Sequence, residues 1–460
     1  MKFIRASHIS TYVKSPFLLW ADVFADESDQ DPEDAFQQLL IRRGFEHEEN
    51  VITQGYEGAE QLVYEDAQEG FKQVLALMKE GVESISQAPI FLNKESLRGR
   101  PDLLVRVDGS SDFGDYQYVV KEIKYAKNIK QHHILQAAFY NKILADMQGV
   151  TSKEFILINH DAQEFSFCYK DYEELLEQTI TAVRDIIDGR VVPKPIFGED
   201  HPWKKLSKDI ATQNQDISLL SGIGRSVRNS LAEKNISSLQ ELSRASKQDV
   251  TTVRGVGPKK YSKMMRQAEV ILSGNEVIKS SPSFKQDVIS IYFDIEGETQ
   301  LDIDYLYGLL VDDEFIAFWA DSPEQEEQVW RQFCSFLNSL NKEFVLYHYA
   351  PYERTSIKKL YLRYGCDEQL YKKIIHSLCD LHKVLKRSVV LPLTSYSIKP
   401  VAKWLDFSWR AEDASGANSM QWYQQYLDGD EDIKKKILAY NEDDVKATKI
   451  VHEYLRSLKN

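Results

Sequence analysis

The sequence predicts a multidomain α/β protein in which a small all-α domain separates two α/β domains. A length of 460 residues corresponds to two to four domains at roughly 100–200 residues each. Hydrophobic residues make up 43% of the chain and charged residues 28%, so each domain can bury a core. The residue pattern changes twice along the chain, and from these changes we predict domains over residues 1–200, 205–280 and 285–460.

The chain carries 57 Lys plus Arg and 71 Asp plus Glu, which gives a net charge of −14. This balance excludes a uniformly basic nucleic-acid coat protein, but it is compatible with a nuclease, because metal-binding carboxylates add negative charge. No run approaches about 18 apolar residues, so we expect neither a membrane span nor a secretory signal. The four cysteines form no C-x-x-C pair, which favours reduced thiols in a cytoplasmic protein.

The first domain contains two short β-type runs, Leu103–Val107 and Tyr118–Ile123, joined by a turn rich in Gly and Asp. Side chains alternate along a strand, so Glu122 and Lys124 point to the same side, and Asp102 can face the same place. Carboxylate oxygens are the ligands that Mg²⁺ prefers, and a lysine can stabilise negative charge at a phosphate. The three residues therefore predict metal-assisted phosphodiester hydrolysis.

Two helical segments flank these strands. The upstream segment carries Gly44 and His47, and the downstream one carries Gln136 and Tyr140, whose i,i+4 spacing places both on one helix face. The order Gly-x-x-His, Pro-Asp, Glu-x-Lys, Gln-x-x-x-Tyr resembles the RecB-like branch of the PD-(D/E)XK nucleases. The resemblance implies a restriction-endonuclease-like α/β fold and one or two Mg²⁺ or Mn²⁺ ions. It also implies metal binding by His47, Asp102 and Glu122, catalysis by Lys124, and a supporting role for Gln136 and Tyr140.

The sequence departs from the iron–sulfur members of that branch. Ser15-Pro16 stands where they carry Cys-Pro, and Cys168 is the region's one cysteine, so we expect no iron–sulfur cluster. The alternative for the acids is a solvated strand edge. His47, beside Glu46, Glu48 and Glu49, also fits a solvated helix face.

The middle region is helical and contains an internal repeat. SGIGRSV and RGVGPKK place Gly222 and Gly224 33 residues before Gly255 and Gly257. Tight helix–helix turns need glycine, and they aim backbone N–H groups outward, where a phosphate can bind. Residues 216–272 hold ten Lys plus Arg and five Asp plus Glu, a balance of +5. The unit resembles a tandem helix-hairpin-helix DNA-binding domain, which implies nucleic-acid contacts from the four glycines and from Arg225, Lys259 and Lys260; the alternative is a structural helical spacer.

From about residue 287 the pattern runs strand, strand, strand, helix, strand, helix, and the last helix is predicted from about Asp432 to Leu458. Asp294 and Glu296 share one face of the first strand, and Tyr440 and Asp444 share one face of the last helix. Glu353 begins a helix between them. These motifs resemble those of the DEDD 3′–5′ exonucleases on an RNase H-like fold.

That resemblance implies that Asp294, Glu296, Glu353 and Asp444 bind two Mg²⁺ or Mn²⁺ ions about 3.5–4 Å apart. It also implies that Tyr440 orients the attacking water. In the middle motif His348 and Glu353 stand where relatives have Asn and Asp, and Asp380 is a second candidate for that acid. The alternative is that these acids only decorate a helix surface and an exposed strand end.

The order of the three domains resembles a bacterial family of RecB-like nucleases, over nearly the whole chain. It implies a metal-dependent nuclease that hydrolyses DNA, in end processing or repair, with no membrane association. Two alternatives remain: a DNA-structure-binding adaptor with one or both sites degenerate, and a ribonuclease. Five aromatic residues either stack on bases or, as we favour, pack in cores: Trp203, Trp404, Trp409, Trp422 and Tyr423.

Overall fold

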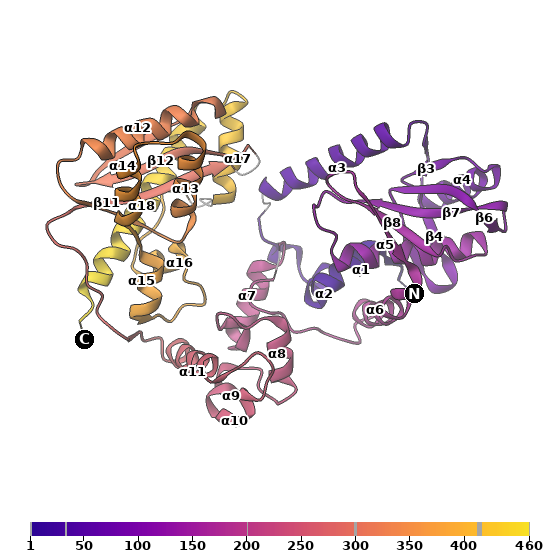
Figure 1. Cartoon of the computed structure of the whole chain (residues 1–460). Helices are drawn as coiled ribbons and strands as arrows, with labels where there is room; N and C mark the ends of the chain where they lie inside the picture. Colours follow the sequence, from indigo (N-terminus) through magenta and orange to yellow (C-terminus); the bar gives the residue numbers. More distant parts are fainter. Residues whose placement is uncertain (1, 33–34, 200, 299–300, 412–415, 460) are drawn as a thin grey trace. The chain divides into compact units, whose positions relative to one another are not determined.

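A computed structural model describes residues 2–32, 35–199, 201–298, 301–411 and 416–459. The chain divides into two compact units, Met1–Gln213 and Asn214–Asn460, which are drawn in Figure 1 and described separately below. Within the described ranges, no helix has the length and apolar character needed to cross a bilayer.

The first unit is built on a six-stranded sheet with the order β2-β3-β6-β7-β8-β9. β6 and β7 are antiparallel, whereas β7 and β8 are parallel and are connected through helix α5 (Gln131–Gln148). Such a parallel pair needs a crossover, and here the crossover is that helix. The strands span Glu60–Gln61, Ser84–Ser86, Leu103–Ser111, Gly114–Ile123, Glu154–Ile158 and Glu164–Cys168.

The two strands predicted in this unit are confirmed, but both are longer than the sequence pattern indicates. β6 runs on to Ser111 and β7 begins at Gly114, so the turn between them is shorter than predicted. Burial alternates with exposure beyond Val107, because this end of the hairpin has one solvated face. A register shift after Asp108 absorbs the glycine in the strand.

Helices cover both faces of this sheet. α5 packs on the face of Tyr118 and Val120, together with α1 (Ala6–Lys14) and α6 (Glu173–Ile187). α3 (Ala35–Gly55) lies on the other face, where Val51 and Ile52 contact Leu103 and Ile123. The remaining elements are α2 (Pro16–Phe24), α4 (Ala67–Glu80), α7 (Lys204–Gln213) and a small sheet of β1 (Ile4–Arg5), β5 (Leu97–Gly99) and β4 (Ile90–Leu92).

The second unit begins with short helices around two glycine turns. Gly222 and Gly255 have φ values of +83° and +86°, which an L side chain rarely adopts, so the predicted reason for glycine holds at these two positions. Leu231, Leu239 and Met264 form part of the buried interior. The helical elements are η4 (Ile217–Leu219), α8 (Arg225–Ala232), α9 (Leu239–Arg244), α10 (Lys247–Thr251) and α11 (Pro258–Ser273).

A five-stranded mixed sheet forms the rest of the second unit, in the order β13-β12-β11-β14-β15. β12 and β13 are antiparallel to their neighbours, and β14 and β15 run parallel to β11. The predicted alternation of strands and helices is confirmed. The strands span Glu314–Trp319, Ile303–Val311, Ile289–Glu298, Phe344–His348 and Leu378–Asp380.

The two faces of β11 (Ile289–Glu298) contact different cores. Phe293 and Ile295 pack with α12 (Glu326–Ser339), whereas Tyr292 packs with the long C-terminal helix α18 (Ile433–Ser457), close to the predicted bounds. Asp294 and Glu296 therefore lie on the α18 side of the sheet. The other helices are α13 (Tyr352–Tyr364), α14 (Glu368–Ser377), α15 (Leu381–Ser388), α16 (Ile398–Trp404) and α17 (Gly416–Leu427).

Candidate functional site

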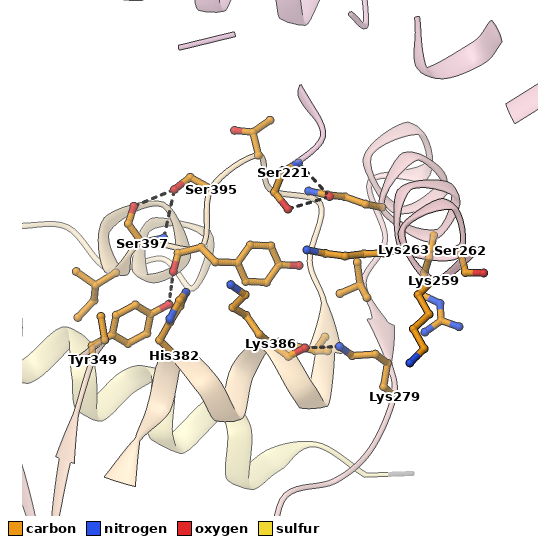
Figure 2. Close-up of a pocket in the computed structure, with 18 residues that line it drawn as sticks. Ser221, Lys259, Ser262, Lys263, Lys279, Tyr349, His382, Lys386, Ser395 and Ser397 are labelled. Atoms are coloured by element: carbon orange, nitrogen blue, oxygen red, sulfur yellow. Dashed lines mark hydrogen bonds between the residues drawn. The ribbon is translucent and has the colours of Figure 1, made fainter. Parts of the chain in front are cut away.

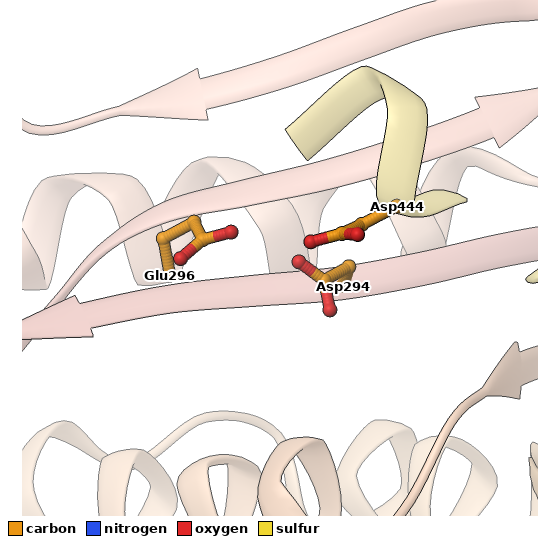
Figure 3. A group of neighbouring side chains, drawn as sticks. All are labelled: Asp294, Glu296 and Asp444. Carbon is orange, nitrogen blue, oxygen red and sulfur yellow. The ribbon is translucent and has the colours of Figure 1, made fainter. Parts of the chain in front are cut away.

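Three carboxylates converge between β11 and α18. Asp294 and Glu296 come from the strand, and Asp444 comes from the helix that crosses it (Figure 3). One oxygen from each lies within 4.8 Å of the others, so the three side chains could hold a metal ion. Glu296 and Asp444 are buried, and Asp294 is partly exposed. Carboxylate oxygens in this number suit a hard divalent cation.

The electrostatics of Asp294, Glu296 and Asp444, together called the acid group, favour bound protons or a bound cation. Burial, followed by the charges of Glu296, Asp444 and Glu353, raises the pKa of Asp294 well above its ordinary value. Burial and Asp444 raise the pKa of Glu296 to about 8. Burial also raises the pKa of Asp444 to about 6, although Trp409, Tyr440 and Lys399 act in the opposite direction. Like charges this close destabilise one another unless a cation neutralises them.

Three side chains that the sequence reasoning missed hold the acids in place. Asn441 Nδ2 donates to Asp294 Oδ2 at 2.7 Å, and Ser419 Oγ donates to Glu296 Oε2 at 2.7 Å. Trp409 Nε1 donates to Asp444 Oδ1 at 2.8 Å. Such partners fix the orientation of ligand groups.

Gly308 on β12 explains how Asn441 reaches the strand. This glycine pairs directly with Asp294, and a Cβ at position 308 would lie 1.6 Å from Asn441 Oδ1. An isolated glycine inside an apolar strand marks a close approach of another group. The run YLYGLLV therefore held a signal for this contact.

Tyr440 and Lys399 border the acid group. Burial, Glu296 and Asp444 raise the pKa of the Tyr440 phenol, so it keeps its proton and can donate a hydrogen bond. The Lys399 ammonium, on α16, lies 5.2 Å from the centre of the Tyr440 ring and 5.5 Å from that of Trp409. Lys399 thus brings a positive charge to the edge of the site, and the sequence pattern gave no indication of it.

The two candidates for the middle acid differ in their surroundings. Glu353 is buried, its Oε2 lies 3.0 Å from His348 Nδ1, and it is near enough to raise the pKa of Asp294. Asp380 instead caps α15, accepting from Lys383 N at 3.0 Å and pairing with Lys383 Nζ at 2.9 Å. Partial burial acts to raise the pKa of Asp380, but hydrogen bonds from Lys383 hold that pKa below its ordinary value.

In the first unit, the predicted residues Asp102, Glu122, Lys124, Gln136 and Tyr140 lie together. Glu122, which is 1% exposed, accepts from Lys124 Nζ at 2.7 Å and from Gln136 Nε2 at 2.9 Å. Gln136 Nε2 also donates to the Tyr140 hydroxyl at 3.3 Å, and Asp102 accepts from the Ile123 amide at 2.7 Å.

Burial and neighbouring charges also shift pKa values in this group. Burial and Glu122 raise the pKa of Asp102 well above its ordinary value, with Lys124 opposing. Burial acts to lower the pKa of the Lys124 ammonium. The charges of Glu122 and Asp102 raise this pKa by more, so the ammonium stays charged. One lysine thus partly neutralises two buried carboxylates.

Glu48, rather than His47, joins this acid group. Gln87 Nε2 donates to Asp102 Oδ1 at 3.2 Å and also to Glu48, and the backbone of Gln87 has a φ of +50°. Burial and Glu122 raise the pKa of Glu48. His47 Nε2 lies 3.1 Å from the carbonyl oxygen of Asn159, and no hydrogen bond among the described residues joins His47 to either acid. A strained backbone such as that of Gln87 is a signal of function that no sequence pattern shows.

The glycine turns of the second unit have open surroundings. Gly224 and Gly257 cap the N-termini of α8 and α11 with φ values of −79° and −81°, and neither would bring a Cβ within 4 Å of another atom. Lys259 is exposed and Lys260 partly exposed on the first turn of α11, and Arg225 begins α8. Arg228, by contrast, pairs with Asp216 at 2.7 Å inside the fold.

The five aromatic residues serve mainly in packing. Trp203, Trp422 and Tyr423 are buried, and Trp404 packs against Tyr454 with ring centres 5.5 Å apart. The segment that ends in Trp203 is docked on α2, where Ser15 Oγ donates to Glu199 at 2.8 Å. Trp409 is the exception, because it bonds to Asp444.

Comparisons with known proteins agree with this architecture. No curated protein matches the chain. A family model described as the RNase H superfamily matches residues 291–456, which include all three clustered carboxylates. A model described as a SAM-like helix-hairpin-helix tandem matches residues 215–269, which include both glycine turns. The chain therefore contains an RNase H superfamily domain and a tandem helix-hairpin-helix domain.

Proposed function

We propose that this chain is a divalent-metal-dependent nuclease whose main hydrolytic centre is the acid group Asp294, Glu296 and Asp444. The observation that carries the proposal is the convergence of three carboxylates with raised pKa values inside an RNase H superfamily domain. Nucleases of this superfamily usually use divalent metals. The tandem helix-hairpin-helix domain supports nucleic acid as the substrate.

Different residues at this centre would bind the metal, orient the water and position the carboxylates. Asp294, Glu296 and Asp444, joined by Glu353, would hold Mg²⁺ or Mn²⁺, as in the 3′–5′ exonucleases of the DEDD type. Bound divalent ions polarise a phosphate and acidify a water. The Tyr440 phenol, which keeps its proton, would orient an attacking water by a hydrogen bond. Asn441, Ser419 and Trp409 fix the carboxylates.

Glu353 is our choice for the fourth acid. Its charge raises the pKa of Asp294, whereas Asp380 caps α15 and pairs with Lys383. His348 holds the Glu353 carboxylate through Nδ1 and so sets its direction.

We infer a second hydrolytic centre in the first unit, of the RecB-like PD-(D/E)XK type. Asp102 and Glu122 would bind the metal, with Glu48 as a further carboxylate beside or in place of the predicted His47. Lys124 would stabilise negative charge at the phosphate, and Gln136, which also donates to Tyr140, holds Glu122. The shared burial and the single neutralising lysine support this reading.

The helix-hairpin-helix glycines would bind the phosphate backbone without reading sequence, because Gly224 and Gly257 leave helix N-termini open. DNA end processing or repair is the role we favour, in the cytoplasm.

Digestion of matched, labelled DNA and RNA strands in Mn²⁺ tests the proposal. We expect Asp102→Ala and Asp294→Ala each to remove a separate activity, and the double variant to be inactive while it still binds nucleic acid. Full activity in the double variant would refute the assignment. An inactive parent that binds DNA would instead favour the adaptor, and preferential cleavage of the RNA strand would favour the ribonuclease.

A further inference from the structure

The second unit contains a cavity of about 810 Å³ that the proposed chemistry does not use. It lies between α11 and the segments that carry α15 and α16 (Figure 2). β10 (Val277–Ile278) pairs with β16 (Val389–Val390), and the Lys279 amide donates to the Ser388 carbonyl at 2.7 Å. These bonds tie the helix-hairpin-helix domain to the RNase H superfamily domain along the cavity, which we call the basic groove.

The lining is strongly cationic. No carboxylate in the described part of the chain lines the cavity. Its five cationic side chains are Lys259, Lys263, Arg266, Lys279 and Lys386. Among the described residues, none of the five forms an ion pair. Burial, then the charges of Arg266 and Lys263, lowers the pKa of Lys279. All five cations are exposed, so water screens their repulsion, and together they form a positive surface that suits an anionic ligand.

The lining of the groove comes from the hairpin and from segments that adjoin, in the sequence, residues acting on the acid group. At one end, Lys259 lies on the first turn of α11, two residues after the cap Gly257. On the other side, Tyr349 and Ala350 follow directly on His348, the partner of Glu353. Ile398 directly precedes Lys399, whose charge acts to lower the pKa of Asp444. Ala350, which lines the groove, has a φ of +79°, so the backbone is strained there.

The groove also offers groups for unpaired bases and for phosphate oxygens. The rings of Tyr349 and His382 are 5.4 Å apart and border the cavity, and Ser395 and Ser397, whose hydroxyls lie 3.1 Å from each other, also line it (Figure 2). Cationic side chains interleaved with rings are typical of single-strand binding, because every base has a face on which a ring can stack.

We propose that the basic groove binds the phosphate backbone of a single strand whose end lies at the Asp294 centre, which makes a single strand, or the single-stranded tail of a duplex, the substrate of that centre. The proposal rests on the proposed nuclease function. A duplex would meet the hairpins first and pass only its unpaired strand into the groove.

Fluorescence anisotropy with a labelled oligodeoxythymidylate tests the groove directly. The full chain carries Asp102→Ala and Asp294→Asn to prevent hydrolysis at both proposed centres, and the test variant adds Lys263→Gln and Lys386→Gln. The matched control instead adds Lys372→Gln and Lys435→Gln, two exposed lysines outside the groove. We expect the test variant to bind about tenfold more weakly, and its dependence of log Kd on log salt to fall by about 1.4, or 0.7 for each lost contact.

Arginine at both positions should restore binding, which separates a charge effect from misfolding. Affinity and salt dependence equal to those of the control would overturn the proposal. An equal loss of affinity for duplex without a tail would overturn its single-strand part. An equal loss for thymidine monophosphate alone would replace the strand by a small-anion site.

A second substrate separates this proposal from the nuclease assignment. The p-nitrophenyl ester of thymidine 5′-monophosphate needs only the hydrolytic centre. With Asp102→Ala in every protein to remove the first unit's activity and Asp294 intact, the Lys263→Gln and Lys386→Gln variant should hydrolyse the ester at the parental rate and the oligonucleotide much more slowly. Parental rates on both substrates would overturn the groove. If the parent hydrolyses neither, the nuclease assignment fails, and the anisotropy result alone decides the groove.

Discussion

The contact between Asn441 and Asp294 exists only because residue 308 has no side chain. The motifs Asp-x-Glu and Tyr-x-x-x-Asp predict the three acids that converge, because each motif lies on one strand or one helix face. Ser419 and Trp409 could not be predicted in this way. They come from segments with no periodic relation to the motifs, and only tertiary packing brings them to the acids.

The close approach at Gly308 gives a test by double substitution. Gly308→Ala should destabilise the chain by about 1–3 kcal/mol and weaken Mn²⁺ binding, because its Cβ would collide with Asn441. Asn441→Ala removes the obstacle, so the two substitutions together should cost less than the sum of the single ones. Thermal unfolding of all four proteins measures this, and strict additivity would contradict the contact.

The acid group predicts an unusual pH dependence. The folded-state pKa of Glu296 is about 8 against an ordinary 4.5, and that of Asp444 is about 6 against 3.8. In these windows the folded chain holds protons that the unfolded chain has lost, so stability without metal falls as pH rises from about 4.5 to about 8.

Chemical unfolding across that pH range, compared between the parent and Glu296→Gln, isolates this effect. The variant should lose less stability with rising pH than the parent, and Mn²⁺ should bind the parent more tightly at pH 8 than at pH 6, because the ion displaces protons. A parent and variant with parallel stability profiles would show that Glu296 keeps an ordinary pKa.

At the scale of elements, the strands and helices of the second unit follow the sequence pattern closely, whereas the β6–β7 hairpin does not. Beyond Val107 the run DGSSDFGD has little β propensity, yet cross-strand pairing extends the hairpin to Ser111 and Gly114. The helix-hairpin-helix glycines were predictable, because their spacing repeats and the turns demand a positive φ.

Gly255 and Gly257 lie in one turn, but only the backbone conformation of Gly255 is one that an L residue rarely adopts. Substitution of each by alanine therefore gives a matched pair of variants. Gly255→Ala places an L side chain at a φ of +86° and should lower stability by about 1–2 kcal/mol. Gly257→Ala, at −81° with open space around the new Cβ, should leave stability unchanged but weaken nucleic-acid binding if phosphate approaches that backbone. Thermal unfolding and anisotropy measure both; equal binding by Gly257→Ala and the parent would exclude that approach.

For the molecule as a whole, the sequence predicts the helix-hairpin-helix domain and the RNase H superfamily domain in their order, but not how distant segments combine. The basic groove joins residues 259–279 to residues 349–398, and no local pattern links segments so far apart. In the first unit, likewise, Glu48 on α3 meets Gln87 and Asp102, which lie directly after β3 and directly before β6. The net charge of −14 hides this division between an acidic centre and a cationic groove.

The central claim is that carboxylates from β11 and α18 hold divalent cations. Anomalous scattering from crystals of the full chain soaked in Mn²⁺ tests it most directly, with Asp294→Asn as the control. We predict a peak bounded by Asp294, Glu296 and Asp444 in the parent, and its loss or marked weakening in the variant. A parent crystal with Mn²⁺ bound elsewhere and no peak among these three carboxylates would contradict the account.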